Sequence, residues 1–377
     1  MSFDLTMRSG SKLLRCGYTT GTCAALAASG AARLLLTGST PASLALLTPG
    51  GIRVEVAPIF CRMEGDRAVC AVKKDAGDDP DVTDGMQILA EVKKTDSGIR
   101  IDGGTGVGRV TKPGLDRKVG EAAINTVPRQ MITSAVKDVC EQADYLGGLE
   151  ILISVPGGEE AAKKTFNPML GIEGGISILG TSGIVEPMSE RAIVDTIGTQ
   201  IRQAASLGAK KLIALPGNYA LDFLHAQLPD ISAYPVIKCS NYLGETLDMA
   251  SLCDMEELLL IGHIGKLVKL AGGIMNTHSR MADCRQELFC AHAALCGAEQ
   301  ELCRALMHQP TSDACLTLLE DAGLIAPVLE SLLAAIQRHL SRRAEEMRVG
   351  AVIFSNTRGL LGMTEQAERM IREWRLP

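Results

Sequence analysis

Short apolar runs alternate with helix-like segments through the second part of the chain. The apolar runs of strand length span residues 149–155, 176–179, 211–215, 234–237, 258–261 and 349–354. The helix-like segments between them span residues 189–206, 218–227 and 244–252, with several more between 265 and 343. Strands that alternate with helices are joined by right-handed crossovers, which place helices on both faces of a mostly parallel sheet. We therefore predict a Rossmann-like, three-layer α/β/α domain over residues 147–377.

The first part of the chain has a different pattern, in which helix-like segments accompany several short β-like runs. Residues 20–36 are rich in Ala and Leu and carry little charge, which predicts a buried helix that ends near Gly38. A second helix is expected over residues 129–142. Short β-like runs occupy residues 44–47, 52–56, 68–72 and 88–92. This pattern predicts a two-layer α+β domain over residues 1–146, so the chain is expected to combine α+β and α/β domains.

Small and polar residues follow the predicted strands of the second domain. They are Gly180-Thr181-Ser182-Gly183, Pro216-Gly217-Asn218, Ser240-Asn241, Gly262-His263-Ile264-Gly265-Lys266 and Ser355-Asn356. Ligands of open α/β sheets bind beyond the carboxyl ends of the strands, where helix N-termini also attract anions. Ordinary turns favour the same residue types, so one such loop is not diagnostic. Five together predict a ligand site at this edge.

The distribution of charge indicates what kind of ligand to expect. The chain has 38 basic and 44 acidic side chains, a net charge of 38 − 44 = −6, and only 3% aromatic residues, which argues against a nucleic-acid binder. Two Gly-rich stretches oppose this acidity, because residues 105–129 and 262–285 each carry a net charge of +3. Such stretches are either solvated basic faces or places where a small, multiply anionic ligand binds.

Several common nucleotide-binding and catalytic motifs are absent from the sequence. There is no P-loop, no complete G-x-G-x-x-G, no H-E-x-x-H and no G-x-S-x-G. The twelve cysteines include no C-x-x-C pair, so we expect buried, reduced thiols and no protein-bound metal. Neither an export signal nor an uninterrupted apolar span is found, which predicts a cytoplasmic protein with no membrane contact.

Residues 17–25 form a loop that enters the first predicted helix. The hydroxyls of Thr19, Thr20 and Thr22 could cap that helix or hold an anion there, and small residues of this kind also permit close helix–sheet packing. The sequence leaves these alternatives open.

Taken in order, the motifs resemble the cobalt-precorrin-5B C(1)-methyltransferase family of anaerobic cobalamin biosynthesis. The matching segments lie at residues 15–25, 103–108, 112–115, 120–129, 180–189 and 262–279, so the resemblance runs through nearly the whole chain. Ala122 and Thr126 stand where the family pattern has Pro, and Ala220 stands where it has Gly. The resemblance implies methyl transfer from S-adenosylmethionine to carbon 1 of a cobalt-corrinoid, with the cobalt carried by the substrate.

Specific residues can be assigned to that chemistry as expectations. For S-adenosylmethionine we expect Gly180, Thr181, Ser182, Gly183 and Glu186, because that loop follows a predicted strand. The carboxylate fringe of the corrinoid is expected to meet Arg109, Lys112, Arg129, Lys266, Lys269 and Arg280, with Thr19, Thr20 and Thr22 nearby. His263, His278 and Asp283 are candidates for moving a proton, and a cap or a hydrogen-bonded support is the alternative role for each.

Two other functions remain open. A Rossmann-like half alone would suit a nicotinamide-dependent oxidoreductase, although the incomplete glycine motif argues against it. A non-catalytic corrinoid carrier would bind the macrocycle and transfer nothing. A homo-oligomer and transient contact with neighbouring pathway enzymes are both compatible with the sequence.

Overall fold

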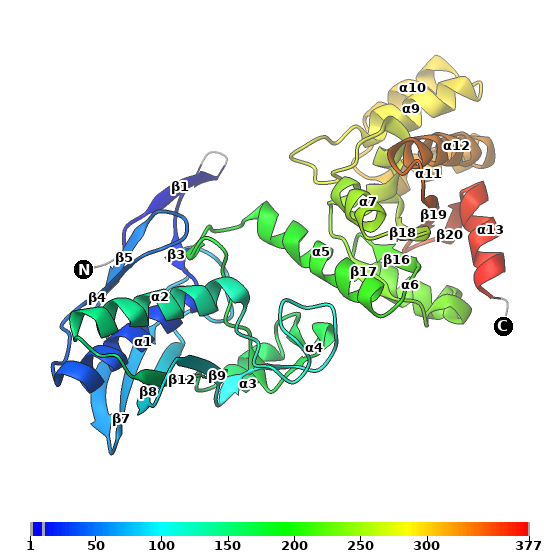
Figure 1. Ribbon diagram of the computed structural model, residues 1–377. Coiled ribbons are helices and arrows are strands. Elements are labelled where there is room, and N and C mark those ends of the chain that lie inside the picture. The colour runs from blue at the N-terminus through cyan, green and yellow to red at the C-terminus, as the bar shows by residue number, and fades with distance from the viewer. Residues whose placement is uncertain (1–2, 10–11, 376–377) are drawn as a thin grey trace. The chain divides into compact units, whose positions relative to one another are not determined.

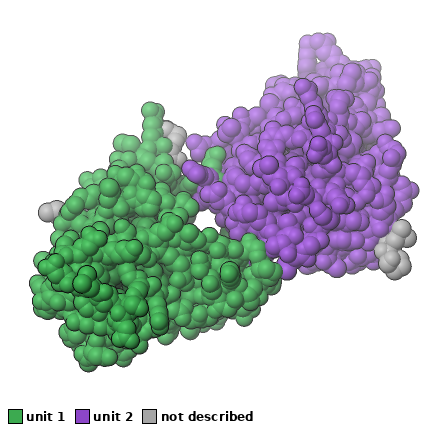
Figure 2. Space-filling view, in the orientation of Figure 1, with its two compact units in different colours: residues 1–190 green, residues 191–377 purple. Residues whose placement is uncertain are grey.

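The computed structural model describes residues 3–9 and 12–375 and shows a mixed α/β protein (Figure 1). The chain forms two compact units, residues 1–190 and 191–377 (Figure 2). The predicted boundary at 146/147 differs from this division because it assigns the apolar run at 149–155 to the second sheet. In the structure this run is β12 (Gly148–Ser154), which pairs with β8 and β9 of the first unit. Its apolar pattern identifies a strand but does not identify the strand's partners.

Unit 1 is built on a five-stranded sheet with the order β6-β7-β8-β12-β9. The other strands of this sheet are β6 (Phe60–Glu64), β7 (Arg67–Lys73), β8 (Gln87–Thr95) and β9 (Ile99–Gly103). Helix α1 (Thr20–Thr37) packs against β7, β8 and α2 (Thr126–Gln142). The α1 helix has the predicted extent: Thr19 caps its start, and Gly38, with φ +70°, ends it.

Short strand pairs surround this sheet. They are β1 (Thr6–Ser9) with β2 (Lys12–Arg15), β4 (Leu44–Leu47) with β5 (Arg53–Val56), β3 (Gly17–Tyr18) with β15 (Ile184–Val185), β10 (Gly106–Val107) with β14 (Gly175–Ile176), and β11 (Arg109–Val110) with β13 (Ile172–Glu173). Two short helices, α3 (Gly158–Ala162) and α4 (Asn167–Leu170), precede β13. Residues 176–179 were predicted as a strand of the second sheet. That prediction is wrong, because only β14 forms there and it pairs with β10.

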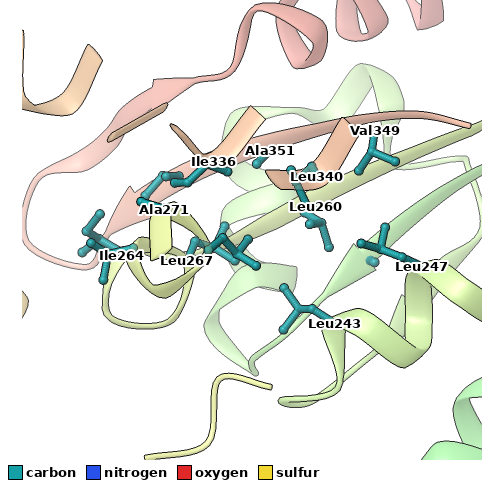
Figure 3. Close-up of a cluster of buried hydrophobic side chains, with 14 of the residues drawn as sticks. Leu243, Leu247, Leu260, Ile264, Leu267, Ala271, Ile336, Leu340, Val349 and Ala351 are labelled. Carbon is teal, nitrogen blue, oxygen red and sulfur yellow. The ribbon is translucent and has the colours of Figure 1, made fainter. Parts of the chain in front are cut away.

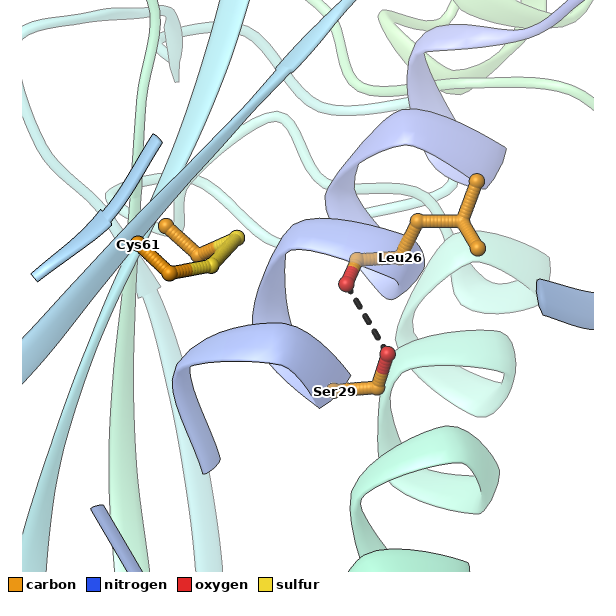
Figure 4. The surroundings of a disulfide bond; sticks show 4 residues. Leu26, Ser29 and Cys61 are labelled. Carbon is orange, nitrogen blue, oxygen red and sulfur yellow. Dashed lines mark hydrogen bonds between the residues drawn. A yellow bond between two sulfur atoms is a disulfide. The ribbon is translucent and has the colours of Figure 1, made fainter. Parts of the chain in front are cut away.

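One cysteine pair departs from the expected reduced state. Cys61 and Cys70 lie directly opposite each other in the antiparallel pair β6/β7, with Cα atoms 4.2 Å apart, and form a disulfide beneath α1 (Figure 4). Such proximity is characteristic of residues paired across neighbouring antiparallel strands. Sequence spacing did not reveal it because the hairpin register was not predicted.

Unit 2 contains a second five-stranded sheet with the order β17-β16-β18-β19-β20, in which β20 alone is antiparallel. The strands are β16 (Lys211–Leu215), β17 (Val236–Lys238), β18 (Glu257–His263), β19 (Arg348–Ser355) and β20 (Gly359–Met363). The helices are α5 (Glu190–Ser206), α6 (Tyr219–Gln227), α7 (Leu243–Leu252), α8 (Ile264–Leu267), α9 (Arg285–Leu295), α10 (Gln300–Met307), α11 (Ser312–Asp321), α12 (Ile325–Arg343) and α13 (Glu365–Trp374), with 3-10 turns η1 (Pro229–Ile231) and η2 (Val268–Gly272).

Both faces of this second sheet are covered by helices. Alternate residues of β18 point in opposite directions, so Leu258 and Leu260 join the larger core with α5, α7 and α12. Figure 3 shows part of that core, where Leu260 lies near side chains of α7, α8 and α12. Leu259 and Ile261 join the opposite core with α6 and α13. The sheet is therefore buried on both sides, and its strand ends are the part left for a ligand.

Candidate functional site

The carboxyl ends of β16 and β18 meet where the strand order of unit 2 reverses. The chain progresses from β16 outward to β17, and then returns to place β18 on the other side of β16. This reversal is the position at which open α/β sheets bind ligands, because the loops that follow the two strands diverge there. The loops in question carry Pro216 and His263–Lys266, both predicted from the sequence as strand-end segments.

Lys266 links the loops at this edge. Its Nζ donates to the carbonyl of Pro216 and, at 3.4 Å, to that of Ser240. Burial lowers the pKa of Lys266, an effect that Cys239 partly offsets and the charge of Lys269 reinforces. The lysine predicted for the substrate fringe is thus held by main-chain carbonyls at the strand ends.

His263 ends β18 with a fixed orientation. Its Nδ1 accepts from the Gly265 N–H at 3.0 Å, so the neutral ring carries its proton on Nε2. That Nε2 lies 3.7 Å from Oδ2 of Asp313, and the ring edge meets Phe354 with centroids 5.7 Å apart. Burial lowers the pKa of His263, and the Asp313 charge partly counteracts this. His263 is therefore a neutral, oriented imidazole at neutral pH.

Asp313 is the functional candidate that the sequence analysis missed. Its Oδ1 accepts from Ser355 Oγ at 2.5 Å and from Thr357 Oγ1 at 3.2 Å, so the carboxylate beside His263 is itself positioned. The neighbouring Ser312 is 3% exposed, and its Oγ has no hydrogen-bond partner among the described residues. A Cβ placed on Gly265 would lie 3.8 Å from that Oγ. Ser312 and Asp313 begin α11, about fifty residues from His263, so local spacing carried no signal.

The other two catalytic candidates lie on the segment after η2. His278 is exposed, and its Nδ1 accepts from the Arg280 N–H at 3.1 Å, which is a local turn bond. Asp283 is paired with Arg285 at 2.5 and 2.9 Å. That hydrogen bond, against the effect of partial burial, lowers the pKa of Asp283. The structure gives both residues local partners.

Lys269 is more deeply buried than its predicted role implies. It is 2% exposed, and its Nζ donates to the carbonyls of Thr277 (3.1 Å) and Ala282 (2.8 Å), with Asp283 Oδ1 at 3.8 Å. Burial lowers its pKa. Lys269 therefore ties the 277–283 loop to η2, while Arg280 on that loop is exposed.

In unit 1 the threonine-rich segment and the 180–183 loop come together. Thr22 Oγ1 donates to the Gly183 carbonyl at 2.7 Å, and Thr20 Oγ1 accepts from the Leu179 N–H at 2.9 Å. The Thr19 N–H donates to Gly183 at 3.0 Å. Thr19, Thr20 and Thr22 are all buried. We call this interlocked pair of segments, residues 17–23 and 177–186, the N-terminal clasp.

The position of the clasp removes the reason for the predicted S-adenosylmethionine site at residues 180–183. Gly180-Thr181-Ser182-Gly183 was assigned to S-adenosylmethionine because it was expected at the carboxyl edge of the second sheet. The loop lies in unit 1 instead. Ser182 and Glu186 line a pocket of about 180 Å³ together with Cys16 and residues of β1.

Three predicted basic residues also lie in unit 1. Arg109 forms a two-pronged pair with Asp102, at 3.1 and 3.0 Å, and its pKa is raised by that hydrogen bond. Lys112 is exposed, and its stem lies against Gly171. Arg129 lines a pocket of about 400 Å³ beside α2.

Residues 3–9 and 12–375 contain no group of three or more His, Cys, Asp or Glu side chains arranged to hold a metal ion. No described helix combines the length and apolarity that a membrane span requires.

Comparison with known proteins identifies the family. The CbiD family model matches residues 7–187, and the model of the CbiD C-terminal domain matches residues 276–365. A protein from Ruminiclostridium cellulolyticum is 50% identical over 346 residues, covering 92% of this chain and 90% of its own. One from Alkaliphilus metalliredigens is 41% identical over 361 residues, covering 96% of this chain and 95% of its own. The chain therefore belongs to the CbiD family.

Both relatives bear the name cobalt-precorrin-5B C(1)-methyltransferase. A crystal structure of a cobalamin biosynthesis protein (cbiD) from Archaeoglobus fulgidus is 29% identical and covers 74% of this chain and 86% of that one, with a TM-score of 0.40. The family resemblance expected from the sequence motifs is confirmed.

Proposed function

We propose that this chain transfers the methyl group of S-adenosylmethionine to carbon 1 of cobalt-precorrin-5B, giving cobalt-precorrin-6A. The observation that carries the proposal is the 50% identity to a protein of that name over 92% of the chain, which extends through both units. Neither the oxidoreductase nor the carrier alternative has comparable support.

The methyl donor supplies a reactive S–CH₃ electrophile, so the protein's task is chiefly alignment and electrostatics. As carbon 1 gives its electron pair to the methyl group, the C–S pair returns to sulfur and the positive charge moves to the macrocycle. Residues that position the two reactants and tolerate or relieve that charge are the ones the reaction needs.

We propose that the donor binds at the carboxyl edge of the unit 2 sheet, within a Rossmann-like unit. Two observations support this placement: the chain reversal between β16 and β18, and the buried, unpartnered Oγ of Ser312 beside Gly265. An orphaned buried hydroxyl is costly unless a ligand or water satisfies it, so this edge fits a polar ligand. The pocket at Ser182 and Glu186 fits less well, because about 180 Å³ is below the roughly 300–1,000 Å³ of small-molecule sites.

His263 is proposed as the base at this edge, where an accepted proton enters at Nδ1 and displaces the Gly265 N–H bond, because Nε2 already carries a proton. Its burial keeps it neutral, and its Nδ1 bond to Gly265 fixes the ring. Asp313 is proposed as a positioning residue that holds the Nε2 side and stabilises the imidazolium when a proton is accepted. Lys266 is proposed to hold the Pro216 and Ser240 loops in register with this ring.

The remaining assignments are kept or narrowed as proposals. Arg129, Lys112 and Arg280 stay as substrate-binding candidates, while Arg109 is paired with Asp102 and Lys269 is buried in a structural role. His278 and Asp283, which the sequence analysis named as candidates for moving a proton, are proposed instead as loop supports. The reaction is proposed to take place in the cytoplasm, and a homo-oligomer or passing contact with neighbouring enzymes is compatible with it.

The decisive experiment follows the methyl group. Purified protein is mixed with cobalt-precorrin-5B and methyl-labelled S-adenosylmethionine, and label is sought in the corrinoid. Label at carbon 1 is the expected result. Corrinoid binding without label transfer would favour the carrier, and stabilisation by NADH but not by S-adenosylhomocysteine in a thermal-shift assay would favour the oxidoreductase.

A further inference from the structure

A basic pocket lies beside the first turns of α2 in unit 1. Its volume is about 400 Å³, and its lining includes the cationic side chains of Arg117, Arg129 and Lys137 together with the hydroxyls of Thr133 and Ser134. No carboxylate is among the residues that line it. Three cations and two hydroxyls directed to one hollow form a donor-rich surface that favours an anion.

Arg129 is fixed in the pocket wall by main-chain atoms. Its Nε donates to the Ile124 carbonyl at 2.9 Å, and its Nη1 donates to the Ile101 carbonyl at 2.8 Å. Both bonds go to neutral carbonyls, so they orient the guanidinium, while the carboxylates of Glu121, Asp102 and Asp116 lie near enough to act on its charge. Burial, and then the nearby charge of Arg117, lower the pKa of Arg129. Arg117 and Arg129 line the same pocket, so an anion bound there would reduce their mutual repulsion.

Among the described residues, not every nitrogen of the Arg117 guanidinium has a hydrogen-bond partner. Its Nη2 pairs with Glu121 Oε2 at 2.6 Å, but its Nε is buried and has no hydrogen-bond partner among the described residues. Asp116 is occupied at the helix start, where it accepts from the Thr126 N–H at 2.5 Å and from the Thr126 hydroxyl at 3.0 Å, and Asp102 is paired with Arg109. The helix N-terminus is thus already capped, and the excess positive charge comes from the side chains.

We infer that this pocket binds carboxylate side chains of the tetrapyrrole substrate, with Arg117, Arg129 and Lys137 as the anchoring cations. The identity of the ligand rests on the proposed function, whereas the anion preference rests on the pocket itself. A hollow of about 400 Å³ admits acidic side chains and not a whole corrinoid with its fringe, so the ring edge is bound through its acid groups.

The test measures binding without turnover. The probes are cobyrinic acid, whose side chains are free carboxylates, its neutral methyl ester, and inorganic phosphate. Variants Lys137→Gln and Arg117→Gln are compared with Lys118→Gln, which removes an exposed charge next to Arg117 but not from the pocket lining. Each pocket variant is expected to raise the Kd for cobyrinic acid about five- to tenfold, as loss of one charge-assisted contact predicts, and the control is expected to leave it within about twofold.

Several outcomes would overturn the inference. An unchanged Kd in Lys137→Gln would do so, because Lys137 is an exposed helix residue outside the core and its substitution leaves folding intact. Equal Kd values for cobyrinic acid and its methyl ester would show that the carboxylate charge does not contribute to binding. Phosphate that competes as strongly as cobyrinic acid would make the pocket a general anion site. Failure of methyl transfer by the wild-type protein, with these binding results intact, would instead reject the proposed function.

Discussion

His263 and Asp313 face each other across the carboxyl edge of the second sheet, with Nε2 and Oδ2 3.7 Å apart. The histidine ends β18 and the aspartate begins α11, so the pair depends on the fold of the long β18–β19 connection and not on local sequence. The imidazole is neutral and oriented by the Gly265 N–H. At 3.7 Å the carboxylate is not hydrogen-bonded to the ring, but its charge lies on the protonated Nε2 side and favours the imidazolium.

Asp313→Asn is expected to lower kcat by about 10²-fold, within the range for weakened acid–base catalysis, and to change the pH profile. The pKa of His263 is already lowered from about 6.5 by burial, and Asp313 raises it, so removing the charge lowers it further. Activity therefore falls, as pH falls, at a midpoint below 6.5 in the wild type and at a still lower pH in the variant.

A pH–rate profile of kcat measures this shift. His225→Asn, which changes a histidine on α6, is the control and should leave the profile unchanged. A midpoint that does not move between wild type and Asp313→Asn would remove Asp313 from the proposed positioning role.

Gly183→Ala is expected to destabilise unit 1 by about 2–4 kcal/mol. The residue has φ +82°, and an added Cβ would lie 2.7 Å from Thr48 Cβ, so backbone strain and a clash add together. Gly120→Ala is a matched control, because φ is +88° there but nothing lies within 4 Å, and only the backbone cost of about 1 kcal/mol is expected. Urea unfolding compares the two, and equal losses would contradict the steric argument.

Lys269→Met is expected to lower the free energy of unfolding by about 2 kcal/mol, because the Thr277 and Ala282 carbonyls lose a buried donor. Protease sensitivity of the 277–283 loop should rise with it. Lys210→Met removes an exposed lysine that donates to one carbonyl, that of Asp254, and should cost much less. A large change in substrate KM with unaltered stability would instead restore Lys269 to the substrate site.

The ionisation of Asp81 makes the free energy of unfolding depend on pH in the acidic range. Burial raises its pKa, but the buried Lys74 ammonium at 3.1 Å and two bonds from Thr83 outweigh this, and the net pKa is lowered. The stabilisation is therefore full above the unfolded pKa of about 3.9 and is lost as pH falls through the lower folded value.

The corresponding variant is Asp81→Asn, which should lose about 3 kcal/mol at neutral pH because Lys74 is left buried without its carboxylate. The difference from wild type should shrink as the pH falls below 4. Asp96→Asn, at an exposed turn, serves as the reference. A stability gap that stays constant down to pH 2 would show that the carboxylate charge is not responsible.

Much of the fold could be predicted from apolar patterning. The α1 helix and the strand β16 have almost the predicted bounds, because a buried Ala/Leu helix ended by glycine and an apolar strand are local signals. Partner choice is not local. The run that forms β12 is equally apolar whether its neighbours are β8 and β9 or a parallel strand, and the unit boundary was displaced for that reason.

The candidate site could likewise be predicted only where local sequence signals mark it. The loop at His263–Lys266 was found because it follows a clear strand, and the structure places it at the sheet reversal. Asp313 and Ser312 could not be found, since only tertiary packing brings α11 to that loop. Lys269 illustrates the opposite case, because a charged residue in a Gly-rich basic stretch gives no sign that it will be buried.

The two segments of the N-terminal clasp are synthesised far apart in time, so the clasp can form only late in translation. Thr19 caps α1 locally, but the hydroxyls of Thr20 and Thr22 also bond to residues 177–183, which leave the ribosome some 160 residues later. Until then the first helix lacks the segment that completes its amino end. A fragment ended at residue 146 would also lack β12, the strand between β8 and β9. The smallest piece of this chain expected to fold by itself therefore extends to about residue 190.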